Sequence, residues 1–189
     1  MNLIRKMFAA AEDTDGLMSD NETDQPRTTE TAPTMVRSLR MGHASHVGRV
    51  RTHNEDALLT IESQFDGDQS LAPFGLYIVA DGMGGHLAGE VASSLAVRVV
   101  ASQLMRDVYT PYILQAAPTS DQVPLTTALE TAVEAANQAV HMQVPGSGTT
   151  LTCALIIDTR AYLAHVGDSR AYLYYNQHLN QVTKDHSYV

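Results

Sequence analysis

Residues 74–86 read Phe-Gly-Leu-Tyr-Ile-Val-Ala-Asp-Gly-Met-Gly-Gly-His: an apolar run, one carboxylate, and then a cluster of glycines. The apolar run predicts a buried strand over 74–80, because short apolar segments bounded by loop residues are typical of strands inside a sheet. Asp81 then lies at the strand end, where a rigid backbone can hold a metal ligand. The glycines let the backbone approach an ion or a phosphate closely. A tight turn with a helix-capping Asp explains the same residues and stays open.

Three other signatures are excluded by residues in and beyond this stretch. A dinucleotide-binding loop needs a third glycine at the position of Leu87. A P-loop needs Gly-Lys-Ser or Gly-Lys-Thr after its glycines, and that sequence is missing. The spacing between Cys153 and Arg160 does not fit cysteine-dependent tyrosine phosphatases. Cys153 stands in an apolar segment and is therefore expected in the core.

The elements around this stretch predict an α+β fold rather than a parallel α/β sheet. Strands cluster in the sequence with two long helices between them, and the short links between strands favour antiparallel pairing. Each helix carries an Ala-rich apolar stripe with helical spacing, which suits close packing on a sheet. Strands are expected at 57–61, 74–80, 149–157, 161–166 and 171–175, and helices at about 86–106 and 124–142.

Prolines are expected to separate these elements. Pro111, Pro118 and Pro124 punctuate the connection between the two helices, and a loop that ends at Pro73 separates the first two strands. The first helix is expected to bury one broad stripe, formed by Leu87, Ala88, Val91, Ala92, Leu95, Ala96, Val99 and Val100.

Composition and charge exclude several classes of protein. The chain has 189 residues, one Cys and a formal net charge of −9. This acidic balance argues against nucleic-acid and anionic-membrane partners, and no stretch is long and apolar enough to span a bilayer. Positions 9–34 carry seven acidic residues, one basic residue and no aromatic residue. We therefore expect a disordered acidic tail over 1–35 and one folded domain over 36–189. The single Cys suits a reducing compartment. A cytoplasmic location and a monomeric state are also expected.

Two other polar clusters lie at expected strand ends. Arg51 and the run Asn54-Glu55-Asp56 precede the first strand, and Gly167-Asp168-Ser169-Arg170 separates two late strands. Taken alone, the first is explained by a solvated ion pair and the second by a hairpin turn. Carboxylate oxygens are hard donors, so a metal held by such residues is expected to be Mg²⁺ or Mn²⁺.

Taken in order, five motifs resemble the bacterial form of the type 2C metal-dependent Ser/Thr protein phosphatases. The resemblance covers about residues 38–189. It implies a four-layer α/β/β/α sandwich, with two antiparallel sheets flanked by helices and a metal centre at one end. The family's domain continues beyond the last motif into further strands, helices and two late Asp motifs, so a C-terminally incomplete domain is also implied. The motifs are Arg51-x-x-Asn54-Glu55-Asp56, Asp81-Gly82-Met83-Gly84-Gly85-His86-x-x-Gly89-Glu90, Gly148-Thr149-Thr150, Gly167-Asp168-Ser169-Arg170 and Asp185-His186-Ser187.

The resemblance implies a set of metal-binding residues. Asp56 and Asp81 are similar to the ligands of a two-metal centre, with Asp81 bridging the ions. Glu55 is similar to a residue that acts through coordinated water, and Gly82 to one that offers its carbonyl. Asp168 resembles a ligand of a third, looser metal in bacterial members.

Two further residues are implied to handle the substrate. Arg51 is expected to hold the substrate phosphate, for which a guanidinium is suited. Eukaryotic members place a His where Met83 stands, so His86 is the nearest candidate for the general acid that protonates the leaving oxygen.

The implied function is hydrolysis of phosphoserine or phosphothreonine in proteins by a metal-activated water. Two Mn²⁺ or Mg²⁺ ions are expected, with a third as a further expectation, and the substrates are expected to be targets of a Ser/Thr kinase. A non-catalytic phosphatase-like module that binds a phosphoprotein or another partner stays open, because the late Asp motifs are missing. A metal-dependent nuclease is disfavoured by the acidic charge.

Overall fold

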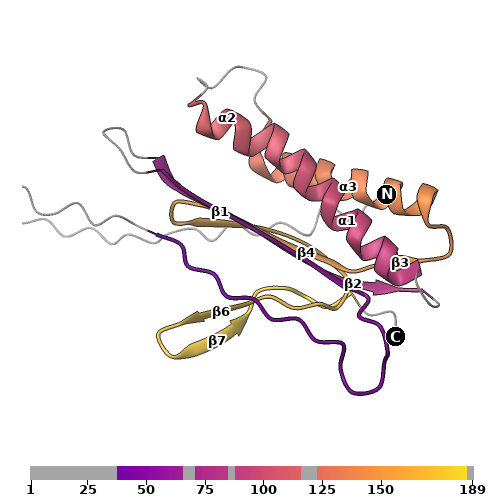
Figure 1. Ribbon diagram of the computed structural model, residues 1–189. Helices are drawn as coiled ribbons and strands as arrows, with labels where there is room; N and C mark the ends of the chain where they lie inside the picture. Colours follow the sequence, from indigo (N-terminus) through magenta and orange to yellow (C-terminus); the bar gives the residue numbers. More distant parts are fainter. Residues whose placement is uncertain (1–37, 66–70, 85–87, 116–122, 187–189) are drawn as a thin grey trace, which may run out of the picture.

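The computed structural model describes residues 38–65, 71–84, 88–115 and 123–186, which form three layers. Figure 1 shows two long helices along one face of a five-stranded sheet, with a small hairpin on the other side of that sheet. The predicted α+β class, with antiparallel sheets and flanking helices, is confirmed. The described residues account for three of the four layers that the resemblance implies. The acidic tail expected over 1–35 lies outside the described residues.

The larger sheet is antiparallel throughout and centres on the apolar run that the sequence analysis singled out. Strand β2 (Leu71–Met83) pairs with β1 (Asp56–Phe65) on one side and with β4 (Leu151–Ile157) on the other, and β4 pairs with β5 (Arg160–Val166). A two-residue strand, β3 (Gly148–Thr149), pairs with the last residues of β2. The end of β2 is therefore held on both sides, by β1 and by β3.

The core lies between this sheet and the helices. Helix α1 (Ala88–Leu104) packs on β1 and β2, and α3 (Leu125–Gln143) packs on α1 and β5. Alternate residues of β2 point into this layer, as the two-residue period of a strand requires. Cys153 is fully buried, as predicted. The largest fully buried side chains are Phe74, Leu76, Ile78, Val100, Leu104, Leu129, Cys153 and Leu155.

Helix α1 buries most of the predicted stripe: Ala92, Ala96 and Val100 are buried, and Leu95 and Val99 pack partly buried against the core. The two edges of the stripe differ from the prediction. Val91, expected in the apolar stripe, is 47% exposed, whereas Ser93 is fully buried. The helix packs against both the sheet and α3, and small side chains permit close approach to both neighbours. The buried positions are Gly89, Ala92, Ser93, Ala96, Val97, Val100, Ala101 and Leu104.

Pro111 does not interrupt the helical segment that precedes it. After α1 the chain continues through a π-helical turn, η2 (Met105–Tyr109), into a short helix, α2 (Thr110–Ile113). Pro111 stands in the first turn of α2, directly after the π-helical turn, and its fixed φ fits the helix. The α-helix itself ends at Leu104, close to the predicted end near residue 106, and the helical path that continues through η2 and α2 was not predicted. Pro118 lies outside the described residues, and Pro124 caps α3.

The late strands belong to two different sheets. Strand β6 (Tyr172–Tyr175) pairs with β7 (His178–Gln181), which was not predicted, and not with β5. The hairpin-turn interpretation of Gly167–Arg170 is therefore wrong, because this segment carries the chain from one sheet to the other. Gly167 has a φ of 107°, in the region that favours glycine, and so permits the change of direction.

Two strand boundaries also differ from prediction. Strand β2 begins before Pro73, which is a buried strand residue and not a loop residue. Pro73 stands near the irregularity in the β1–β2 register, where the ladder does not require its missing N–H. The strand predicted over 149–157 is divided at Thr150, whose N–H donates to the Asp81 carbonyl at 2.9 Å. This division places β3 beside the tip of β2.

Candidate metal centre

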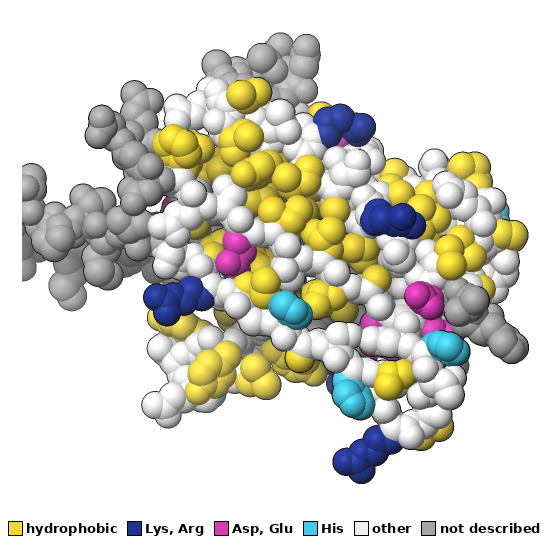
Figure 2. All heavy atoms as spheres, in the orientation of Figure 1, with side chains coloured by type: hydrophobic (Ala, Val, Ile, Leu, Met, Phe, Trp, Pro, Cys, Tyr) yellow, Lys and Arg dark blue, Asp and Glu magenta, His cyan; other side chains and the backbone are white. Residues whose placement is uncertain are grey.

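An open cavity of about 480 Å³ lies at the end of the larger sheet, where the tip of β2 meets β1, β3 and the segment after β5. Figure 2 shows acidic side chains and a histidine close together toward the end of the molecule where Figure 1 places β3. Most of the predicted site residues line this one cavity. The lining residues are Arg51, Glu55, Asp81, Gly82, Met83, Gly84, Thr150 and Asp168.

Asp56 and Asp81 are partners across the β1–β2 ladder, at the end of the two strands. Directly opposed residues of an antiparallel pair send their side chains to the same face of the sheet. Burial raises the pKa of Asp81, and the negative charge of Asp56 raises it further; Arg51 lowers this pKa, and the charge of Asp168 raises it. Carboxylates that repel one another in this way fit a divalent cation, which removes the repulsion.

The backbone of Glu55 is fixed by donors from two neighbouring elements. The buried Ser93 hydroxyl on α1 donates to the Glu55 carbonyl at 2.7 Å, and the Gly82 N–H donates to the same carbonyl at 3.1 Å. The Glu55 carboxylate accepts a hydrogen bond from the Arg51 guanidinium at 3.1 Å. Helix α1 therefore positions Glu55 through Ser93, a residue that the sequence analysis missed.

Two glycines let β2 and α1 approach each other beside the cavity. A Cβ at Gly82 would lie 2.1 Å from the Gly89 carbonyl oxygen and 2.7 Å from the Glu55 carbonyl oxygen. A Cβ at Gly89 would lie 3.0 Å from Glu55 Oε2. The glycine spacing seen in the sequence is therefore a packing requirement at the base of the site.

A pair of hydroxyl groups joins the strand of Asp81 to the segment of Asp168. The buried Thr150 Oγ1 accepts from the Asp81 N–H at 2.9 Å and pairs with Ser169 Oγ at 2.7 Å. Ser169 follows Asp168 directly in the chain. Two carboxylate-bearing segments that are distant in the sequence are therefore linked through one side chain. The sequence analysis assigned no such role to Thr150, because the link depends on the division of the strand there.

Replacing Thr150 by Val removes both hydroxyl contacts and keeps the shape of the side chain. We expect the free energy of unfolding to fall by about 1–3 kcal/mol, because the Asp81 N–H and the Ser169 hydroxyl lose their partner. Urea denaturation measures the change. Thr150→Ser keeps the hydroxyl and should recover most of the loss. An unchanged free energy of unfolding in Thr150→Val would show that the two hydroxyl contacts do not contribute to the stability.

The described side chains do not form a ready-made metal cage. In the part of the chain that the structure describes, no group of three or more His, Cys, Asp or Glu side chains lies at metal-ligand spacing. His86, the candidate general acid, falls outside the described residues. Met83 lines the cavity and is 56% exposed. The ligand roles of the individual carboxylates therefore stay predictions.

The sequence of this chain matches a known protein family. The family described as Protein phosphatase 2C matches residues 41–188, a span that includes every helix and strand described above. The chain belongs to this family.

Curated relatives are bacterial serine/threonine phosphatases. The serine/threonine phosphatase stp of Listeria monocytogenes serotype 4b is 36% identical over 148 residues, which cover 75% of this chain and 52% of that protein. The serine/threonine protein phosphatase PstP of Mycobacterium tuberculosis is 38% identical over 157 residues, which cover 80% of this chain and 26% of that protein. The chain spans about half the length of stp and a smaller share of PstP.

Solved structures show the same likeness. The crystal structure of the M. tuberculosis phosphatase PstP/Ppp has a TM-score of 0.50 at 38% identity, covering 73% of this chain and 51% of that one. PppA of Pseudomonas aeruginosa, described as a key regulatory component of T6SS, has a TM-score of 0.57 at 31% identity. The match covers 81% of this chain and 60% of that one. The predicted relationship to bacterial type 2C phosphatases is confirmed.

Proposed function

We propose that this protein hydrolyses phosphoserine and phosphothreonine in other proteins, with Mn²⁺ or Mg²⁺ held at the end of β1 and β2. The observation that carries the proposal is the pairing of Asp56 with Asp81 beside a cavity that Arg51 and Asp168 line. The family and its serine/threonine phosphatase members support the reaction.

The donor set suits hard divalent cations. Carboxylates and a backbone carbonyl offer only oxygen, which Mg²⁺ and Mn²⁺ prefer. We assign Asp56 and Asp81 to a two-ion site, with the Gly82 carbonyl as a further donor and Glu55 acting through coordinated water. Asp168 is assigned to a third, looser ion. Two such ions supply an activated water for attack on phosphorus and neutralise the phosphate charge.

Arg51 and His86 are assigned to the substrate. The Arg51 guanidinium lines the cavity and reaches Glu55 through Nη1, so its other N–H groups are available for phosphate oxygens. His86 is assigned to protonate the leaving serine or threonine oxygen.

Arg51→Ala should raise the KM for a phosphothreonine peptide by at least about tenfold and change kcat much less. The reason is that a charge-assisted hydrogen bond to the phosphate stabilises the ground state and the transition state alike. Steady-state kinetics measure the split. Arg98→Ala removes an exposed arginine of α1 outside the cavity and should leave KM unchanged. A fall in kcat at unchanged KM would contradict the binding role.

Phosphate release from a phosphothreonine peptide by the full 189-residue chain tests the proposed function. We expect release with Mn²⁺ or Mg²⁺, and no release after both ions are removed with EDTA. Separate titrations with the two ions establish which one the protein uses.

Two other outcomes of this assay would replace the proposal. Tight binding of the phosphopeptide without release would favour a non-catalytic module. Hydrolysis of DNA but not of the peptide would favour a nuclease.

The cellular setting is part of the same proposal. We propose a cytoplasmic monomer that acts on the targets of a Ser/Thr kinase. The Lys and Arg side chains on the face drawn in Figure 2 stand apart from one another, which disfavours nucleic acid as a partner. Among the described helices, none combines the length and the apolar character that a membrane crossing requires.

A further inference from the structure

Residues 167–171 include Asp168, and the first of them, Gly167, is hydrogen-bonded to His186. The His186 N–H donates to the Gly167 carbonyl at 2.7 Å, and the Gly167 N–H donates back to His186 Nδ1 at 3.3 Å. The His186 ring also lies 5.0 Å, centroid to centroid, from the ring of the buried His165 on β5. The residue before Asp168 is therefore fixed by two reciprocal contacts.

The same segment is tied at its other end. The Ala171 N–H donates to Thr183 Oγ1 at 3.0 Å, and the Val182 N–H donates to the Ala171 carbonyl at 3.0 Å. Residues 182–186 thus follow the whole stretch from Gly167 to Ala171 and hold both of its ends.

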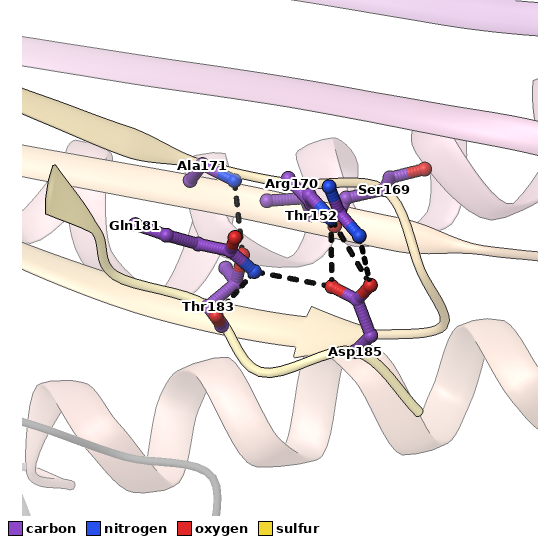
Figure 3. A network of polar contacts seen from close by, with 7 residues as sticks. All are labelled: Thr152, Ser169, Arg170, Ala171, Gln181, Thr183 and Asp185. Atoms are coloured by element: carbon purple, nitrogen blue, oxygen red, sulfur yellow. Dashed lines mark hydrogen bonds and ion pairs between the residues drawn. The ribbon is translucent and has the colours of Figure 1, made fainter. Parts of the chain in front are cut away.

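An ion pair of defined geometry lies between these two ties. Arg170 Nε donates to both carboxylate oxygens of Asp185 at 3.0 Å, and Nη2 donates to Oδ2 at 2.6 Å. The Gln181 amide donates to Asp185 Oδ1 at 3.1 Å and so orients the carboxylate from the other side. Figure 3 shows dashed lines from the Asp185 carboxylate to both Arg170 and Gln181. A guanidinium fork that meets a carboxylate in this way fixes orientation as well as distance.

Core packing does not hold this part of the molecule. Within the described residues, β6 and β7 make their substantial contacts with each other, and their side chains are exposed. An isolated two-stranded hairpin is marginally stable in water. The position of residues 167–171, which lead into the hairpin, therefore depends on their polar contacts with residues 182–186, together with the Thr150–Ser169 pair.

We infer that Asp185 is a positioning residue for Asp168: through its ion pair with Arg170 it holds the Asp168 carboxylate at the cavity, where Asp168 contributes to binding a divalent cation. This inference rests on the proposed function, because that proposal places a cation at this cavity. It adds a role for the Asp185–His186 pair, which contributes no residue to the cavity lining.

A double-mutant cycle with Mn²⁺ as the probe tests the inference on the full chain. Calorimetric titrations compare the wild type with Asp185→Asn, Asp168→Asn and the double variant. We expect Asp185→Asn to weaken the Asp168-dependent binding event by about tenfold, as loss of an outer partner of a ligand does. In the Asp168→Asn background the same change should have no further effect, because residues that act through one another are not additive.

Two more variants separate geometry from charge and from general stability. Arg170→Lys keeps the charge but lacks the fork, so it should weaken the same event as Asp185→Asn does. Asp107→Asn breaks another Arg–Asp ion pair, formed with Arg106 at 2.8 Å on η2, and should leave Mn²⁺ affinity unchanged.

Three results would overturn the inference. They are unchanged Mn²⁺ affinity in Asp185→Asn, an equal loss in the presence and absence of Asp168, and no binding event that depends on Asp168. The last result leaves the proposed function standing if an Asp81-dependent event and phosphate release persist. Failure of the proposed function has a different signature, which is loss of the Asp81-dependent event itself.

Discussion

Asp81→Asn is expected to stabilise the cation-free protein while abolishing its phosphatase activity. Burial and the neighbouring Asp56 raise the pKa of Asp81 above its ordinary value of 3.8 in the unfolded chain. The folded state then binds this proton more tightly, so stability falls as the pH rises above that ordinary value. Asparagine does not titrate, so the variant does not lose this stability as the pH rises. Thermal unfolding in EDTA, from below pH 3.8 to neutral pH, should show a growing advantage for the variant.

The same substitution should remove the activity. Asparagine carries no charge to hold an ion between β1 and β2, so we expect phosphate release to fall by about 1,000-fold or more. The stabilisation of the wild type by Mn²⁺ in thermal unfolding should disappear as well, because a ligand stabilises only the state that binds it. Glu134→Gln, at an exposed position of α3, is the matched control and should change neither property. A variant that keeps the wild-type rate would exclude Asp81 from the reaction.

Gly82→Ala should cause the largest loss of stability among single substitutions at the site. The added Cβ would meet two backbone oxygens, those of Gly89 and Glu55, at 2.1 Å and 2.7 Å. Backbone on both sides cannot swing away as a flexible side chain does, so α1 has to separate from β2. We expect a loss of about 3 kcal/mol or more, a large part of the ~5–15 kcal/mol that holds a typical domain together.

Urea denaturation of Gly82→Ala measures this loss directly. Gly42→Ala is the control, because nothing lies within 4 Å of a Cβ placed there. An unchanged midpoint for Gly82→Ala would show that the two elements are not packed as closely as the structure has them. Two results agree with the expectation. The variant is either unfolded, or it keeps the far-UV circular dichroism spectrum of the wild type and unfolds at a lower urea concentration.

The strands and helices were largely predictable, because their signals are local. The apolar run before Asp81 and the helical stripe of α3 each report burial through residue spacing alone. The pairing of Asp56 with Asp81 was not derivable from spacing, since register depends on how two distant strands meet. The resemblance to a family placed both residues in one site, and the ladder shows that they are directly opposite.

The residues that support the site were missed for a physical reason. Ser93 lies on an otherwise apolar face, and its role appears only when α1 docks on the Glu55 carbonyl. The β-branched residues around Thr150 favour one continuous strand, but the strand is divided at Thr150. Its hydroxyl accepts from the Asp81 N–H, and its own N–H donates to the Asp81 carbonyl. The stretch after Gly167 has the composition of a hairpin turn, yet tertiary contacts to residues 182–186 direct it to a second sheet. Such contacts connect distant parts of the chain and leave no periodic signal.

The most direct test of the account is to locate the cation on the protein. Substoichiometric Mn²⁺ added to the ¹⁵N-labelled full chain broadens the amide signals of residues near the ion in NMR spectra. We predict that the amides of Asp56, Asp81 and Gly82 broaden first, while those of His178 on β7 and Glu134 on α3 stay sharp. Broadening that begins elsewhere, or no localised broadening at all, would contradict a metal centre at the end of β1 and β2.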